Sequence, residues 1–156
     1  LLFCAMLVLT MSLNTVNAQA GALDYLGHTI DGSELTNEME SIGNYQSVAR
    51  STYLHQGFVR ITNNGGGYVG IGAGTECNVT CGTVKLNVYL ERSSGSEDFY
   101  SYKKWENVDY NTSSLYLNQQ VKVEKGYYYR LRGYHSCTKN GVLENGASRT
   151  DGIYIG

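Results

Sequence analysis

The sequence predicts an all-β protein, a single antiparallel β-sandwich of about seven strands. Apolar and polar residues alternate over several short segments, which is the period of a strand that is buried on one face. Turn sequences rich in Asn, Gly and Ser separate these segments. No helical periodicity lies between them, and a chain of 156 residues has room for one domain of ordinary size.

The first element is an apolar run at the start of the chain, followed by small residues that end near Ala18 and Ala20. This order is typical of a secretory signal peptide, and the run is too short to span a bilayer. Cys4 lies at the start of the run rather than after it, so we expect no lipid anchor. We predict that residues 1–20 are removed, that the product is secreted, and that it carries no membrane anchor.

The rest of the chain divides into an arm and a domain. Residues 21–45 are polar with weak periodicity, and we expect them to form an extended N-terminal arm. Residues 46–156 are expected to form the sandwich. Within it, the alternation predicts strands at 57–62, 67–73, 84–91, 99–108, 115–124, 127–137 and 149–155.

The segment KGYYYRLRGYHSC, residues 125–137, combines aromatic and basic side chains and so invites comparison with an RNA-binding strand. The RNA-binding pattern K/R-G-F/Y-G/A-F-V-x-F/Y requires a small residue where Tyr128 stands, and Arg130 replaces its apolar position. The net charge of −2 supplies no basic field to attract a polyanion. We therefore expect no nucleic-acid binding.

A tight corner explains the start of this segment better. Val123, Gly126 and Tyr129 lie at the offsets of the motif L-x-P-G-x-x-Y-x-V-x-V, with lysine in place of the proline. Here the chain resembles the E–F corner of a fibronectin type III or immunoglobulin-like domain. The resemblance implies a structural tyrosine corner, in which the hydroxyl group of Tyr129 bonds to upstream backbone after a turn at Gly126.

Alternation in the strand that follows places one set of side chains outside the core. Cross-strand aromatic and cation–π pairs account for such a set without any ligand, but it is also a possible binding face. This set consists of Tyr128, Arg130, Arg132 and Tyr134.

A second resemblance covers residues 84–156. This part contains VKLNVYLER, VKVEKGYYYRLRGYHS and the closing TDGIYIG. It resembles a family of small secreted proteins of unassigned function from Gram-positive, mostly clostridial bacteria. The resemblance implies export and an all-β fold, and it supplies no catalytic residues.

Removal of the leader leaves three cysteines, Cys77, Cys81 and Cys137. In the predicted sandwich their loops emerge at the same end, and an oxidising compartment favours a disulfide. We expect Cys137 to pair with Cys77 or with Cys81, and a local bridge between Cys77 and Cys81 is the less favoured pairing. The alternative is a zinc site in which His135 joins the three cysteines.

Residues 63–74, NNGGGYVGIGAG, place small residues at every second position of a predicted strand. A dinucleotide-binding loop needs a helix that starts in the glycines, and no helix is predicted here. The pattern instead leaves one face of the strand bare, which suits close sheet packing or an aromatic side chain, Trp105 or a tyrosine, lying across it.

The sequence shows no nucleophile and base in a recognisable context, so we expect no enzyme activity and no cofactor. The leading hypothesis is a secreted, non-catalytic recognition or adhesion module that binds a glycan or an extracellular protein. The 14 tyrosines and Trp105 suit stacking against sugars. A secreted bacteriocin-like effector is the alternative, and a zinc-dependent enzyme comes third.

Overall fold

The computed structural model describes residues 21–46 and 51–156, so the expected signal peptide and Cys4 lie outside the described residues. The prediction of an all-β protein is confirmed. The described residues form nine strands and one short 3₁₀ turn, η1 (Ala22–Tyr25). None of their helical segments is long and apolar enough to cross a membrane.

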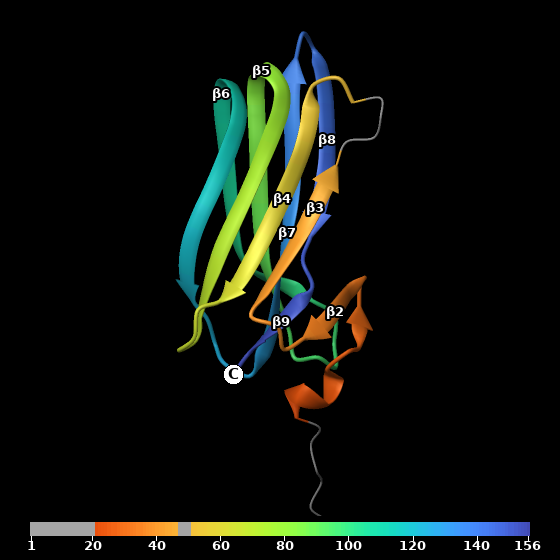
Figure 1. Ribbon diagram of the computed structural model, residues 1–156, viewed down its shortest axis with the longest axis vertical. Coiled ribbons are helices and arrows are strands. Elements are labelled where there is room, and N and C mark those ends of the chain that lie inside the picture. Colours follow the sequence, from red (N-terminus) through yellow and green to blue (C-terminus); the bar gives the residue numbers. More distant parts are fainter. Residues whose placement is uncertain (1–20, 47–50) are drawn as a thin grey trace, which may run out of the picture.

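The strands pair into one mixed sheet (Figure 1). They are β1 (Thr29–Ile30), β2 (Ser33–Thr36), β3 (Glu40–Gln46), β4 (Leu54–Asn63), β5 (Tyr68–Ser93), β6 (Tyr100–Lys122), β7 (Tyr127–Lys139), β8 (Val142–Arg149) and β9 (Gly152–Ile155). The order is β1-β2-β9-β7-β5-β4-β3, with β6 also paired to β5 and β8 also paired to β7. The pairing of β2 with β9 is parallel, and the other pairings are antiparallel.

Two long strands, β5 and β6, make the sheet fold over on itself. The first part of β5 pairs with β4, its last part pairs with β7, and β6 follows it along both parts. The register shifts between Glu76 and Cys81, where β5 bends at the top of Figure 1. The predicted strands 67–73 and 84–91 are therefore both parts of β5, and 99–108 and 115–124 are both parts of β6. A sandwich of the immunoglobulin or fibronectin type stays a prediction.

The core lies between the two layers that this fold-over creates. Alternate apolar residues of β4 and early β5 face those of late β5 and β7, as period-2 patterning requires. The central side chains are at most 3% exposed, and they include Val59, Ile61, Val69, Ile71, Leu86, Val88, Leu90 and Leu131.

Residues 21–45, expected as an arm, take part in the sheet at both ends of its strand order. Strand β3 pairs along its length with β4, while Leu35 and Thr36 of β2 pair with β9. Leu35 is fully buried. The N-terminal part of the described chain is thus an integral part of the domain.

Candidate functional site

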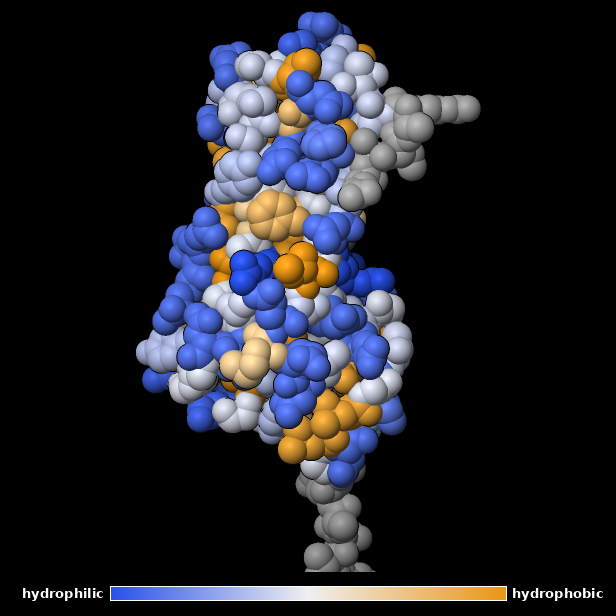
Figure 2. Space-filling view, in the orientation of Figure 1, coloured by the Kyte–Doolittle hydropathy of each residue, from blue (hydrophilic) through white to orange (hydrophobic). Residues whose placement is uncertain are grey.

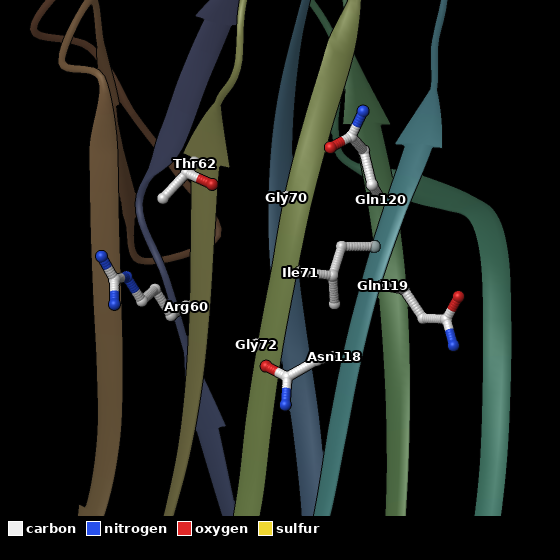
Figure 3. Close-up of a pocket in the computed structure, with 8 residues that line it drawn as sticks. All are labelled: Arg60, Thr62, Gly70, Ile71, Gly72, Asn118, Gln119 and Gln120. Atoms are coloured by element: carbon white, nitrogen blue, oxygen red, sulfur yellow. The ribbon is translucent and has the colours of Figure 1, made fainter.

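A shallow groove runs along the outer face of β5, between β4 and β6 (Figure 3). The strand register places Gly72 between Arg60 on β4 and Asn118 on β6, and Gly70 between Thr62 and Gln120. The groove has a volume of about 470 Å³ and is lined by Arg60, Thr62, Gly70, Ile71, Gly72, Asn118, Gln119 and Gln120. Figure 2 shows that the face turned toward the viewer is largely hydrophilic, with apolar side chains gathered near its lower end and a few others above.

Glycines make the floor of this groove. A Cβ atom at Gly70 would collide with Thr62, and one at Gly74 would lie 2.8 Å from Cδ1 of Tyr116. At Gly72 a Cβ atom would lie 3.7 Å from Oδ1 of Asn118, which is an ordinary van der Waals contact, so this position of the floor is bordered by the Asn118 side chain without a clash. The bare strand face predicted from the sequence is therefore the groove floor.

Two aromatic side chains close one end of the floor. Phe58 and Tyr116 lean over Gly74 from either side, with ring centroids 6.4 Å apart. The Tyr116 hydroxyl group donates a hydrogen bond of 2.7 Å to Oε1 of Glu76, which raises the pKa of the tyrosine. Sequence reasoning expected Trp105 or a tyrosine across the bare strand face, but it did not name Phe58 or Tyr116. Their positions opposite Gly74 could have indicated them once the strand pairing was known.

Polar groups line the rest of the groove. Nε of Arg60 donates to Oε2 of Glu40 at 2.6 Å, and the Thr62 hydroxyl group donates to Oδ1 of Asn64 at 3.1 Å. The Asn118 side chain makes no hydrogen bond to any other described residue, and it is exposed. The Thr62 hydroxyl group and the free Asn118 amide thus lie beside the glycine floor, whereas the Arg60 guanidinium group points away from it toward Glu40 on β3 (Figure 3).

The possible binding face needs a correction. Tyr128 and Arg130 do lie on the side opposite the core, but both are fully buried. The Tyr128 hydroxyl group donates to the backbone oxygen of Ala22 at 2.8 Å, because the N-terminal segment covers this part of β7. Only Arg132 and Tyr134 of the predicted set remain accessible. They line a second hollow of about 530 Å³ together with Asn87, Tyr89, Glu91, Phe99 and Ser101.

Arg130 holds the N-terminal segment against the sheet. Its Nε donates to Oε2 of the buried Glu91 at 2.8 Å, and its Nη2 donates to Oδ2 of Asp31 at 2.6 Å. The second oxygen of Glu91 accepts from Nη2 of Arg132 at 2.5 Å. The hydrogen bond and the charge of Arg130 hold the pKa of Asp31 below its ordinary value. This cluster has a structural role that the sequence pattern did not reveal.

Tyr129 is fully buried, and its hydroxyl group donates to the backbone oxygen of Glu124 at 2.9 Å. Gly126 between them has a φ of 89°, a conformation that favours glycine. These are the contact and the turn that the tyrosine-corner interpretation expects. Burial raises the pKa of Tyr129 to about 12, so the hydroxyl group stays protonated as a donor.

The three cysteines meet where β5 bends. Their Sγ atoms all lie within 4.8 Å of one another, and all three are free thiols. Cys81 and Cys137 are each 1% exposed, whereas Cys77 is half-buried. Burial raises the pKa of Cys77 to about 11. The expected disulfide between Cys137 and one of the other two stays a prediction.

His135 does not join this cluster, and the zinc set that included it is wrong in that respect. Its Nδ1 lies 2.9 Å from the Thr75 hydroxyl oxygen, and its Nε2 lies 2.7 Å from that of Ser148. Burial lowers the pKa of His135 to about 4, so the ring is neutral and one nitrogen donates while the other accepts. His135 is thus a hydrogen-bonded core residue.

Together these features define an all-β domain with a solvent-facing polar groove and a buried thiol cluster. The chain belongs to the family of unknown function DUF6147, whose model matches residues 25–152. None of the curated proteins matches the chain. The expectation of a family without an assigned function agrees with this membership, while its clostridial source stays a prediction.

Proposed function

We propose that this protein is a secreted, non-catalytic recognition module that binds a glycan in the groove on β4, β5 and β6. The observation that carries this proposal is the hollow of about 470 Å³ over Gly70 and Gly72, where the floor has no side chains and Asn118 lies beside it. Sugars present neighbouring hydroxyl groups, which both donate and accept hydrogen bonds. The hydroxyl group of Thr62 and the free amide of Asn118 suit them for this reason.

The aromatic end of the groove supports a sugar ligand further. Phe58 and Tyr116 offer apolar ring surface beside the polar floor, and the apolar C–H face of a pyranose packs against such rings. A protein partner is favoured less by this surface, because the buried core of a protein interface is more apolar than this mostly polar lining.

The groove can be blocked without disturbing the fold. Gly72→Val fills the floor, and the nearest atom to its Cβ would be 3.7 Å away. Asn118→Ala removes the free amide. Asn145→Ala is the matched control, because Asn145 is an exposed residue on β8, outside the groove lining.

The test is a screen of the purified full chain against an array of bacterial cell-wall and host-type oligosaccharides, followed by calorimetric titration of the best binder. We expect Asn118→Ala to weaken binding by roughly tenfold, which is the loss of about one hydrogen bond, and Gly72→Val to weaken it at least as much because its side chain occupies the floor. Asn145→Ala should bind as the parent does. A silent array, or binding that both groove variants retain, would refute the proposal.

Export is part of the same proposal. The leader-like composition of residues 1–20 supports it. Mass spectrometry of protein recovered from the culture medium should find a chain that starts near residue 21. Retention of the uncleaved chain inside the cell would contradict export while leaving the groove to be judged by the oligosaccharide array.

A further inference from the structure

The three-cysteine cluster has the spacing of a metal site. Zinc–sulfur bonds are about 2.3 Å long, so two sulfur ligands of one tetrahedral ion lie about 3.8 Å apart. The three Sγ atoms, all within 4.8 Å of one another, are already close to that separation. Two segments of the chain supply them. Cys77 and Cys81 lie at the bend of β5, and Cys137 lies on β7, where it pairs with Val84 of β5.

We propose that Cys77, Cys81 and Cys137 together bind one thiophilic metal ion of the Zn²⁺ class through three thiolates. Soft thiolate ligands select Zn²⁺ and Cu⁺ over hard cations such as Mg²⁺ and Ca²⁺. Cys77 is the half-exposed member of the three, so the ion enters on its side and a water molecule is the expected fourth ligand there. His135 is not needed, because both its nitrogens are engaged elsewhere.

The apolar surroundings explain why the three thiols become thiolates only when an ion binds. Leu54 and Val84 belong to the same buried cluster, and Leu115 packs against it. In such apolar surroundings a thiol stays protonated, because a lone thiolate would be poorly solvated. When the ion binds, each S–H bond is replaced by a metal–sulfur bond, and the thiol protons are released to solvent.

A disulfide is the competing fate of the same sulfurs in an oxidising compartment. It would join two of the three and leave the third as a thiol beside it, whereas an ion uses all three. The ion is favoured because each of the three sulfur atoms lies within 4.8 Å of the other two. The proposal does not rest on glycan binding, because the groove lining contains none of the three cysteines.

The test uses the full chain with Cys4→Ser, so that every thiol counted belongs to the cluster. The reduced, metal-free protein is titrated with Zn²⁺ against a chromophoric chelator, and with Co²⁺ to record the sulfur-to-cobalt charge-transfer band. We expect one ion per chain and protection of all three thiols from alkylation. At a hundredfold excess over Kd, Zn²⁺ should raise Tm by roughly 5–10 °C.

Variants separate the ligands from their neighbours. Cys77→Ser, Cys81→Ser and Cys137→Ser should each weaken Zn²⁺ binding at least tenfold, while Ser136→Ala beside Cys137 should leave it unchanged. Cys77→Ser is the variant least expected to disturb folding, because Cys77 is only half-buried.

Two results would overturn the proposal. One is the absence of stoichiometric binding by the reduced protein. The other is a protein, purified without reductant, that has a single reactive thiol and a mass two hydrogen atoms lower than the reduced form, since this shows a disulfide in place of the ion.

Discussion

Replacing Arg130 by methionine should destabilise the domain strongly. Arg130→Met keeps an unbranched side chain but removes the guanidinium group, which is fully buried. The lost contacts join β7 to Glu91 of β5, to the side chain of Ser33 at 3.0 Å and to the backbone oxygen of Asp31 at 3.2 Å. The guanidinium carbon also lies 4.2 Å from the ring centroid of Phe99.

The magnitude follows from what remains buried. Removing one partner of a buried ion pair costs about 3–5 kcal/mol, because the other charge is left without compensation. Arg132 still pairs with Glu91 in the variant, so we expect the lower end, about 3 kcal/mol. That is a large part of the roughly 5–15 kcal/mol by which an ordinary domain is stable.

Arg149→Met is the matched control. Arg149 approaches the same Asp31, at 3.8 Å, but its side chain is 37% exposed. Exposed pairs contribute at most about 1 kcal/mol. Urea unfolding at neutral pH, followed by tryptophan fluorescence, measures both variants. If Arg130→Met loses no more stability than Arg149→Met, then the buried cluster does not hold the N-terminal segment as described.

Three further predictions concern single contacts. Tyr129→Phe should lose about 1 kcal/mol in urea unfolding, because the Glu124 backbone oxygen loses its donor. Glu144→Gln should also lose about 1 kcal/mol. Burial would raise the pKa of Glu144, but hydrogen bonds from the backbone amides of Leu54, Thr52 and Tyr53 and from the Ser51 hydroxyl group lower it to about 2. The neutral amide of glutamine accepts these hydrogen bonds less strongly than the carboxylate does. The lowered pKa of Asp31 means that its stabilisation is present above its ordinary value of 3.8 and is lost as the pH falls through the folded value. Hydrogen exchange in residues 29–36 should therefore speed up, relative to the intrinsic rate, at the acid end.

Each of these predictions has its own control. Tyr134→Phe removes a hydroxyl group from an exposed tyrosine and should leave stability unchanged. Glu106→Gln replaces an exposed carboxylate by an amide and should likewise leave stability unchanged. Asp31→Asn should remove the acid-induced step in residues 29–36. A step that persists in Asp31→Asn would assign it to another carboxylate, and equal losses in either mutant pair would contradict the corresponding contact.

Local patterning predicted segments of β4, β5, β6, β7 and β9, but it missed β8 and the three strands before β4, and it did not reveal how the segments join. Alternation around Val69 and around Val88 has the same form in both segments, and it carries no sign that they belong to one bent strand. The glycines at 70 and 72 marked a bare strand face. Whether that face is buried or exposed depends on how the layers pack against each other, and no short segment of sequence specifies this packing.

The site residues show the same division. Alternation predicted that the side chains of Arg130 and Leu131 point to opposite faces of their strand, and in the structure they do so on β7. Burial of Arg130 comes from residues near Ser33, about a hundred positions earlier in the chain, and only tertiary structure reveals it. The partners of His135 are Thr75, 60 positions earlier, and Ser148 on the neighbouring strand β8, and only the pairing of the strands reveals both, so spacing alone could not separate a core histidine from a metal ligand.

The sharing of β5 and β6 between both layers affects how the chain folds. Tyr68 pairs with Lys122, so the ladder can close at that end only after a long loop is ordered. Folding dominated by such distant pairings is slow, on the scale of milliseconds to seconds. Because β5 and β6 each run through both layers, neither layer can unfold without the other. We therefore expect one cooperative unfolding transition for the whole domain.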